Sequence, residues 1–227
     1  MTRLGALTSL DVAPEAPTKS LLVIPVGATE QHGPHLPLDT DTVIATTLAG
    51  RLGGDTLIAP PLPYGSSGEH QVFPGTLSIG QEAVETVLVE LVRSATETFS
   101  RVLLLCAHGG NAEPLTRAVR RLRAEGRDVR AWSPASVWDG DAHAGHVETS
   151  VMLALRPEMV AMQRAAAGNT TALGTLIGSM RDGGVGAVSA NGVLGDPTSA
   201  SAPAGAELIT RAVAALRAFV ADWTDAA

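Results

Sequence analysis

The sequence predicts an α/β fold, a single-domain α/β/α sandwich around a mainly parallel sheet. Short apolar runs typical of buried strands alternate with longer segments of helical periodicity. Polar loops follow these runs, where the carboxyl ends of parallel strands would lie. A chain of 227 residues also suits one domain. We therefore expect residues 1–227 to form a single domain, in which residues 1–19 make an N-terminal arm.

The first half of this pattern begins with a surface arm that carries a short helix near residues 4–10. The apolar run at 21–26 predicts a buried strand. The polar loop that follows contains Gly33, Pro34 and Pro37, which disfavour a helix. Further along, periodicity predicts a helix at 41–52, a strand at 57–59, a long loop at 60–78 and an amphipathic helix at 81–98.

The second half contains the clearest buried strand, at residues 102–107, and His108 comes directly after it. We expect a helix at 113–124, another strand at 129–132 and a helix that Pro157 stops. Residues 168–203 are rich in Gly, Ser, Thr and Asn, and we assign no helix or strand to them. The final helix is expected at 205–223.

Composition excludes several classes of protein. A net charge of −7 argues against nucleic acid as a partner, because such binding depends on clustered cations. Cys106 is the single cysteine, so no intramolecular disulfide can form and a reducing, cytoplasmic location fits. No apolar run reaches the length of about 18 residues that a membrane span needs, so we expect no membrane partner.

Side chains suited to metal chemistry gather in the loops. All six histidines lie between positions 32 and 146, together with Glu30, Asp41, Glu69 and Glu148. Any one histidine is most simply a surface or core residue, but the group at strand-to-helix junctions favours a common site. Imidazole and carboxylate ligands without cysteine suit zinc, iron(II) or manganese(II). The number of ligands is enough for a metal pair that activates water to hydrolyse an amide.

Two interpretations stay open at this point. The residues after His108 are Gly109 and Gly110, which would also suit a simple tight turn between strand and helix. The dipeptide Glu69-His70 lies in a loop that can equally be an exposed surface segment.

Four motifs resemble those of the creatininase family of metal-dependent amidohydrolases. They are Glu30 to Asp41, Gly68 to Ser78, His108 to Asn111, and His143 to Ser150, and they occur in the same order over about residues 20–200. The resemblance implies a creatininase-like α/β fold, two divalent metal ions per subunit and a homo-oligomer.

Residue roles follow from the same resemblance. It implies that Glu30 and His108 bind one metal ion and His32 the other, with Asp41 bridging both. His143 matches the family's proton donor to the leaving nitrogen. One departure is Gly110, which stands where creatininase has a ligating glutamate. We expect Glu148 to replace that glutamate, either as a ligand or as a proton carrier. The residues expected to contact substrate are Ser66, Glu69, His70, Asn111 and His146.

Within the family, the sequence is similar to peptidases of mycofactocin maturation, notably around residues 141–146 and 192–198. This similarity implies cleavage before the modified C-terminal Val-Tyr unit of a precursor peptide. A first alternative is a hydrolase of small cyclic amides or formamides. A second, from another class, is a non-catalytic metal-binding scaffold.

Overall fold

The computed structural model describes residues 2–12 and 21–225. Contacts between residues divide the chain into two compact units. We name as the sheet unit the segments Met1–Gly27, Asp41–Ser66 and Ile79–Pro134. We name as the loop unit the segments Ala28–Thr40, Ser67–Ser78 and Ala135–Ala227. Both units are therefore assembled from segments that are far apart in the sequence.

The sheet unit contains a parallel sheet with the strand order β1-β3-β2-β4-β5 among the described residues. Its central strand β2 is buried along its whole length, as an apolar run between two neighbouring strands must be. Residues Leu21 to Val26 of β2 pair in register with Arg101 to Cys106 of β4. The strands are β1 (Thr2–Arg3), β2 (Leu21–Val26), β3 (Leu57–Ile58), β4 (Arg101–Cys106) and β5 (Val129–Trp132).

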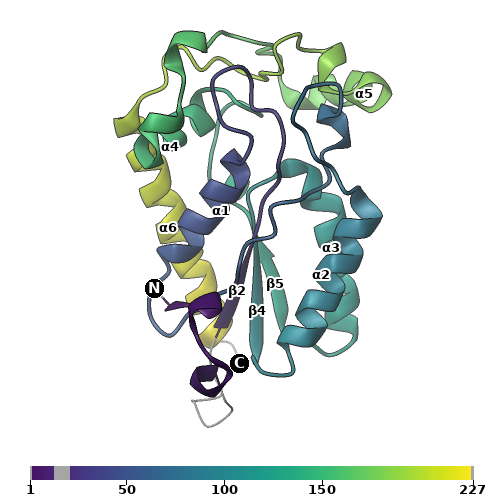
Figure 1. Cartoon of the computed structure of the whole chain (residues 1–227), viewed down its shortest axis with the longest axis vertical. Helices are drawn as coiled ribbons and strands as arrows, with labels where there is room; N and C mark the ends of the chain where they lie inside the picture. Colours follow the sequence, from purple (N-terminus) through teal and green to yellow (C-terminus); the bar gives the residue numbers. More distant parts are fainter. Residues whose placement is uncertain (1, 13–20, 226–227) are drawn as a thin grey trace. The chain divides into compact units, whose positions relative to one another are not determined.

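Helices α2 (Gln81–Ala95) and α3 (Ala112–Ala124) lie side by side next to β4 and β5 (Figure 1). Both are amphipathic, and Leu88 and Leu122 are fully buried in one apolar cluster with the strand residues Ile24 and Leu104. Helix α1 (Thr40–Gly50) follows the polar loop and buries Ile44 and Leu48.

The loop unit contains helices α4 (His146–Leu155), α5 (Leu173–Gly183) and α6 (Ala202–Asp225). Helix α4 packs along α6, while Leu176 of α5 joins Val185 and Leu194 in a small apolar cluster. Single turns of 3-10 helix connect the longer elements. They are η1 (Leu4–Ala6), η2 (Ser9–Val12), η3 (Gly68–His70), η4 (Gly109–Asn111), η5 (Pro134–Ser136), η6 (Pro157–Met159), η7 (Met162–Arg164) and η8 (Val185–Ala187).

The predicted α/β class with a parallel sheet is confirmed. Two segments differ from the expectation. Residues 173–183 form helix α5 although the surrounding composition is typical of loops, because Leu176 supplies a buried anchor for a helix that otherwise lies exposed. Thr2 and Arg3 of the expected arm form an edge strand beside β3, followed by 3-10 turns rather than an α-helix. Residues 13–20 of the arm lie outside the described residues. Of the helices that are described, none has the length and apolar character needed to cross a bilayer.

Candidate metal centre

The loop at residues 28–40 folds back on itself and buries its acidic and imidazole side chains. The backbone N–H of Glu30 donates to the carbonyl of Leu38 over 3.0 Å, which closes the loop. Gly33 has a φ of 66°, a conformation that costs other residues free energy. Glu30 and His32 are both fully buried as a result. Buried ionisable groups are costly unless they are paired or bind a cation.

The ring of His32 is oriented by its own loop. Its Nδ1 lies 3.1 Å from the backbone oxygen of Glu30. Because a carbonyl oxygen can only accept, Nδ1 must carry the proton of this hydrogen bond. The other ring nitrogen, Nε2, then faces the Glu148 carboxylate at 3.9 Å. This arrangement is typical of a metal-binding histidine, whose second N–H is held by a carbonyl or carboxylate.

His143 shows the same arrangement. Its Nε2 donates to the backbone oxygen of Gln31 over 2.8 Å, and its Nδ1 lies 3.7 Å from Glu30 Oε1. Its ring also stacks at a tilt on His32, with the centroids 4.4 Å apart. The next residue, Ala144, is the one non-glycine residue with positive φ within the described residues, at 53°. Such local strain is often found at functional sites.

His70 has the opposite orientation of donor and acceptor. The side-chain amide of Gln31 is fixed because its Oε1 accepts from Gly33 N–H over 2.8 Å and its Nε2 donates to Gly192 O over 3.1 Å. The same Nε2 also lies 2.7 Å from His70 Nδ1, which must therefore accept. His70 Nε2 then carries a proton and faces Glu30 Oε1 at 3.5 Å. His70 is thus placed to hold the Glu30 carboxylate by donating to it.

The sheet unit contributes a second pair of acidic and imidazole groups. Asp41, in the first turn of α1, and His108, which follows β4, are both buried. His108 Nε2 donates to the backbone oxygen of Ser66 over 2.9 Å, and Nδ1 lies 3.3 Å from Asp41 Oδ2. An unprotonated nitrogen so close to a carboxylate oxygen requires a shared proton or a cation.

Three histidines therefore share one arrangement. His32, His108 and His143 each donate one ring N–H to a backbone carbonyl and direct the other nitrogen toward a carboxylate. In the loop unit, Glu30, His32 and His143 offer ligand atoms that all lie within 4.8 Å of one another. Nitrogen and oxygen donors that are buried and already oriented fit a divalent metal such as zinc, iron(II) or manganese(II).

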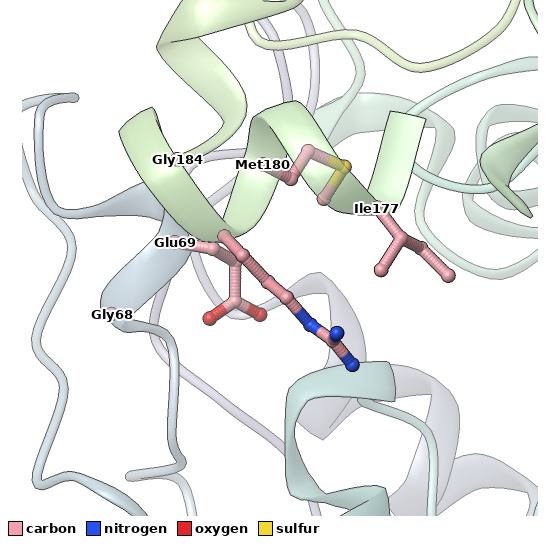
Figure 2. A pocket seen from close by; sticks show the side chains of 6 residues that line it. Gly68, Glu69, Ile177, Met180 and Gly184 are labelled. Atoms are coloured by element: carbon pink, nitrogen blue, oxygen red, sulfur yellow. The ribbon is translucent and has the colours of Figure 1, made fainter. Parts of the chain in front are cut away.

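The remaining residues of the expected site have mixed surroundings. Asn111 is fully buried; its side chain accepts from Ser66 N–H over 2.8 Å and donates to Gly27 O over 3.0 Å. His146 is partly exposed, with Nδ1 3.1 Å from Ser199 Oγ. Glu148 accepts from Ala144 N–H over 2.6 Å. Glu69 is half-buried and lines a cavity of about 380 Å³ together with Met180 and Ile177 of α5 (Figure 2).

Two further groups outside the expected ligand set shape the site's surroundings. His35 is buried, with Nε2 2.8 Å from Thr149 Oγ1; burial, and then the charge of His32, lower the pKa of its imidazole to about 4. Cys106 is a buried free cysteine, and burial raises the pKa of its thiol, which disfavours the reactive thiolate.

The sequence did not indicate the central position of Gln31. Its side chain joins His70 to the backbone of Gly192, and its backbone oxygen accepts from His143. Gly192 has a φ of 77°, and a Cβ atom there would lie 2.1 Å from Gln31 Oε1. A usable signal was present, since the turn around Gly192 belongs to a segment that resembles the peptidase motif.

Comparison with known proteins supports this interpretation. A family model described as creatinine amidohydrolase matches residues 5–220. The mycofactocin precursor peptide peptidase of Mycolicibacterium smegmatis is 50% identical over 92% of this chain and 87% of that protein. A solved structure titled "Creatininase Mn" is 25% identical, with a TM-score of 0.79 over 97% of this chain and 98% of the other. A mutant creatininase of "Zn-Zn type" is 25% identical, with a TM-score of 0.78 over 97% of each chain. The chain belongs to the creatininase family of metal-dependent amidohydrolases.

Proposed function

We propose that this chain is a peptidase that uses divalent metal to release the modified C-terminal Val-Tyr unit of a mycofactocin precursor peptide. The observation that carries the metal dependence is the shared arrangement of the two proposed histidine ligands, His32 and His108, each held by a backbone carbonyl and facing a carboxylate. The choice of substrate is supported by the relatives named as precursor peptide peptidases, at about half of all positions identical.

The proposed ligands are five side chains for two metal ions per subunit. Glu30 and His108 would hold one ion, His32 and Glu148 would hold the other, and Asp41 would be shared by both. Support comes from the motif order and from two pairs of facing groups, His32 with Glu148 at 3.9 Å and Asp41 with His108 at 3.3 Å. Glu148 would supply the carboxylate that creatininase provides from the position that Gly110 occupies in this chain. The alternative for Glu148 is a proton carrier.

Bound metal supplies Lewis acidity, which lowers the pKa of water and polarises the amide carbonyl. The chain's own groups handle the protons. We assign to His143 the uptake at Nδ1 of the proton that the attacking water loses and its delivery to the leaving nitrogen, since Nε2 keeps its own proton in the hydrogen bond to Gln31 O. His70 holds Glu30 by donating from Nε2. Gln31 fixes the rings of His70 and His143. The proposed substrate contacts are Ser66, Glu69, Asn111 and His146.

The proposal includes a single domain, a homo-oligomeric assembly and a cytoplasmic location. Its main competitor within the family is hydrolysis of a small cyclic amide or formamide, as in creatinine amidohydrolase. The loss of a ligand position at Gly110 disfavours creatinine itself as the substrate.

The test is an assay with protein reconstituted separately with zinc, iron(II) and manganese(II). The modified precursor peptide, creatinine and a formamide are supplied in parallel, and products are identified by mass spectrometry. We expect Val-Tyr release from the precursor, its loss with chelator and its return when metal is added back. Turnover of only the small amides would replace the peptidase proposal with the competing one. Metal-independent cleavage would contradict the metal assignment.

A further inference from the structure

The turn that leads into helix α4 carries an aspartate to which the proposed reaction gives no part. His143 lies in this turn, and Glu148 lies in the first turn of the helix. Asp141 comes two residues before His143, in the segment that resembles the peptidases of the family. Among residues 2–12 and 21–225, Asp141 belongs to none of the groups that could hold a metal ion.

Both carboxylate oxygens of Asp141 accept hydrogen bonds from the start of α4. Oδ2 accepts from the backbone N–H of His146, and Oδ1 accepts from that of Val147 over 3.1 Å. The first N–H groups of a helix have no partner within the helix, and a carboxylate is also favoured there by the helix dipole. Gly145 occupies the usual capping position and has no side chain to use. Asp141 therefore caps α4 from outside the helix.

Two glycines leave room for this carboxylate. A Cβ at Gly145 would lie 1.9 Å from Asp141 Oδ2, and a Cβ at Gly195 would lie 2.4 Å from Asp141 Cβ. Gly145 has a negative φ of −96°, so the carboxylate, rather than a left-handed backbone, excludes a side chain at that position. The Asp141 side chain is thus enclosed from two segments of the loop unit.

The capped turn holds the backbone of His143. The N–H of Leu194 donates to His143 O over 2.8 Å, and His143 N–H donates to Leu194 O over 3.3 Å. The next residue, Ala144, has a φ of 53°, and its N–H donates to the Glu148 carboxylate over 2.6 Å. A positive φ at alanine persists only where surrounding contacts enforce it. The two hydrogen bonds to Asp141 supply such contacts, because they close the turn onto the helix.

We propose that Asp141 is a positioning residue, which sets the places of His143 and Glu148 by capping the helix that follows the turn. In this role it touches neither substrate nor metal ion and acts only through those two residues. The inference rests on the peptidase function proposed above. It predicts that loss of the cap lowers kcat and leaves KM nearly unchanged, because a misplaced proton carrier slows the chemical step.

The experiment measures kcat and KM for the precursor peptide at saturating metal, with wild type, Asp141→Ala and Asp141→Asn. Asparagine keeps the size of the side chain but only one acceptor oxygen. Gly145→Ala is an independent variant, because it displaces the carboxylate while Asp141 itself stays in the chain. The control is Asp11→Ala, which removes an exposed aspartate that also accepts two hydrogen bonds, both from Thr8. Urea denaturation gives the folded fraction of each protein.

A second measurement does not depend on activity. The ring N–H of His143 donates to Gln31 O, and its proton signal is recorded by NMR in metal-free protein. We expect this signal to shift in Asp141→Ala and in Gly145→Ala, since the turn that carries the ring is no longer held. It should keep its wild-type position in Asp11→Ala.

We expect kcat to fall about 100-fold in Asp141→Ala and Gly145→Ala and about 10-fold in Asp141→Asn, with KM within about twofold of wild type. Asp141→Asn carries the test if the alanine variants do not fold. A wild-type kcat in folded variants, or an unchanged ring signal, would overturn the inference and leave the peptidase function intact. A fall in kcat that only matches the unfolded fraction would overturn it as well. No cleavage by wild type would instead refute the proposed function, while the ring signal would still report whether Asp141 sets His143.

Discussion

The Nε2 atom of His143 lies 2.8 Å from the backbone oxygen of Gln31, which leaves Nδ1 of the same ring facing Glu30 at 3.7 Å. This single hydrogen bond decides which nitrogen of His143 is available for chemistry. The Gln31 side chain in turn fixes the His70 ring. The orientation of two histidines therefore depends on one glutamine that binds neither metal nor substrate in our proposal.

Gly192→Ala tests this dependence. The new Cβ would lie 2.1 Å from Gln31 Oε1, so the side-chain amide must move and the His70 ring loses its fixed partner. A shift of Gln31 also disturbs its backbone oxygen, which holds the His143 ring. We expect kcat to fall about 100-fold, the usual effect of displacing a reacting group by about 1 Å. Folding should persist, as judged by circular dichroism. The measurement is kcat with the precursor peptide.

The control for this variant is Gly53→Ala. Gly53 has the same φ of 77°, but a Cβ there meets no atom within 4 Å. Gly53→Ala should lower the free energy of unfolding by about 1–2 kcal/mol, the cost of a positive φ for alanine, and should keep full activity. Equal activity losses in both variants would mean that strain, and not the displaced Gln31 side chain, explains the effect.

Asp41→Ala tests the bridging assignment. If Asp41 contacts both ions, its removal should lower the metal content of the purified protein from two ions toward none, with a loss of at least about 100-fold in affinity. Metal is counted by mass spectrometry and binding by titration. Asp55→Ala removes an exposed carboxylate of the same unit and should keep both ions. Full metal occupancy in Asp41→Ala would refute the bridging role.

Asn111→Ala distinguishes a structural role from the predicted substrate contact. The side chain joins Ser66 N–H to Gly27 O in the interior. Its removal leaves both backbone groups without that partner, at a cost of about 2–3 kcal/mol in the free energy of unfolding. Urea denaturation measures this cost, with the exposed Gln163→Ala as control. A raised KM with unchanged stability would favour the substrate contact instead.

His35 predicts a dependence of stability on pH. The pKa of its ring is about 4 in the folded chain, against an ordinary value of 6.5, so the unfolded chain binds a proton that the folded chain does not. The resulting stabilisation is fully present above about pH 6.5 and is lost as pH falls toward 4. Between these pH values, His35 changes the free energy of unfolding by at most about 1.4 kcal/mol per pH unit.

The measurement for His35 is chemical denaturation between pH 4 and 7 with chelator present, which removes the separate effect of metal loss. His35→Asn should show a shallower decline of unfolding free energy than wild type. Identical slopes in the two proteins would show that another group is responsible.

The sequence by itself determined most regular elements and the chemical type of the site. Residues 21–26 form a strand with the predicted bounds, because a strand buried on both faces of a parallel sheet places all six consecutive apolar side chains in the interior. The motifs around Glu30, His108 and His143 indicated the creatininase family, which comparison confirmed. Helix α5 was not predicted, since its one buried anchor, Leu176, gives too weak a periodic signal.

Only the tertiary structure decided how each imidazole is used. The ring of His143 is set by the backbone oxygen of Gln31, which is 112 positions away in the sequence. The side chain of Gln31 is held by the backbone oxygen of Gly192, which is 161 positions away. Composition and periodicity report local burial, whereas the proton on a given ring nitrogen depends on which acceptor the fold brings beside it. The cavity that Glu69 and Met180 line has the same origin, because η3 and α5 meet only in the folded chain.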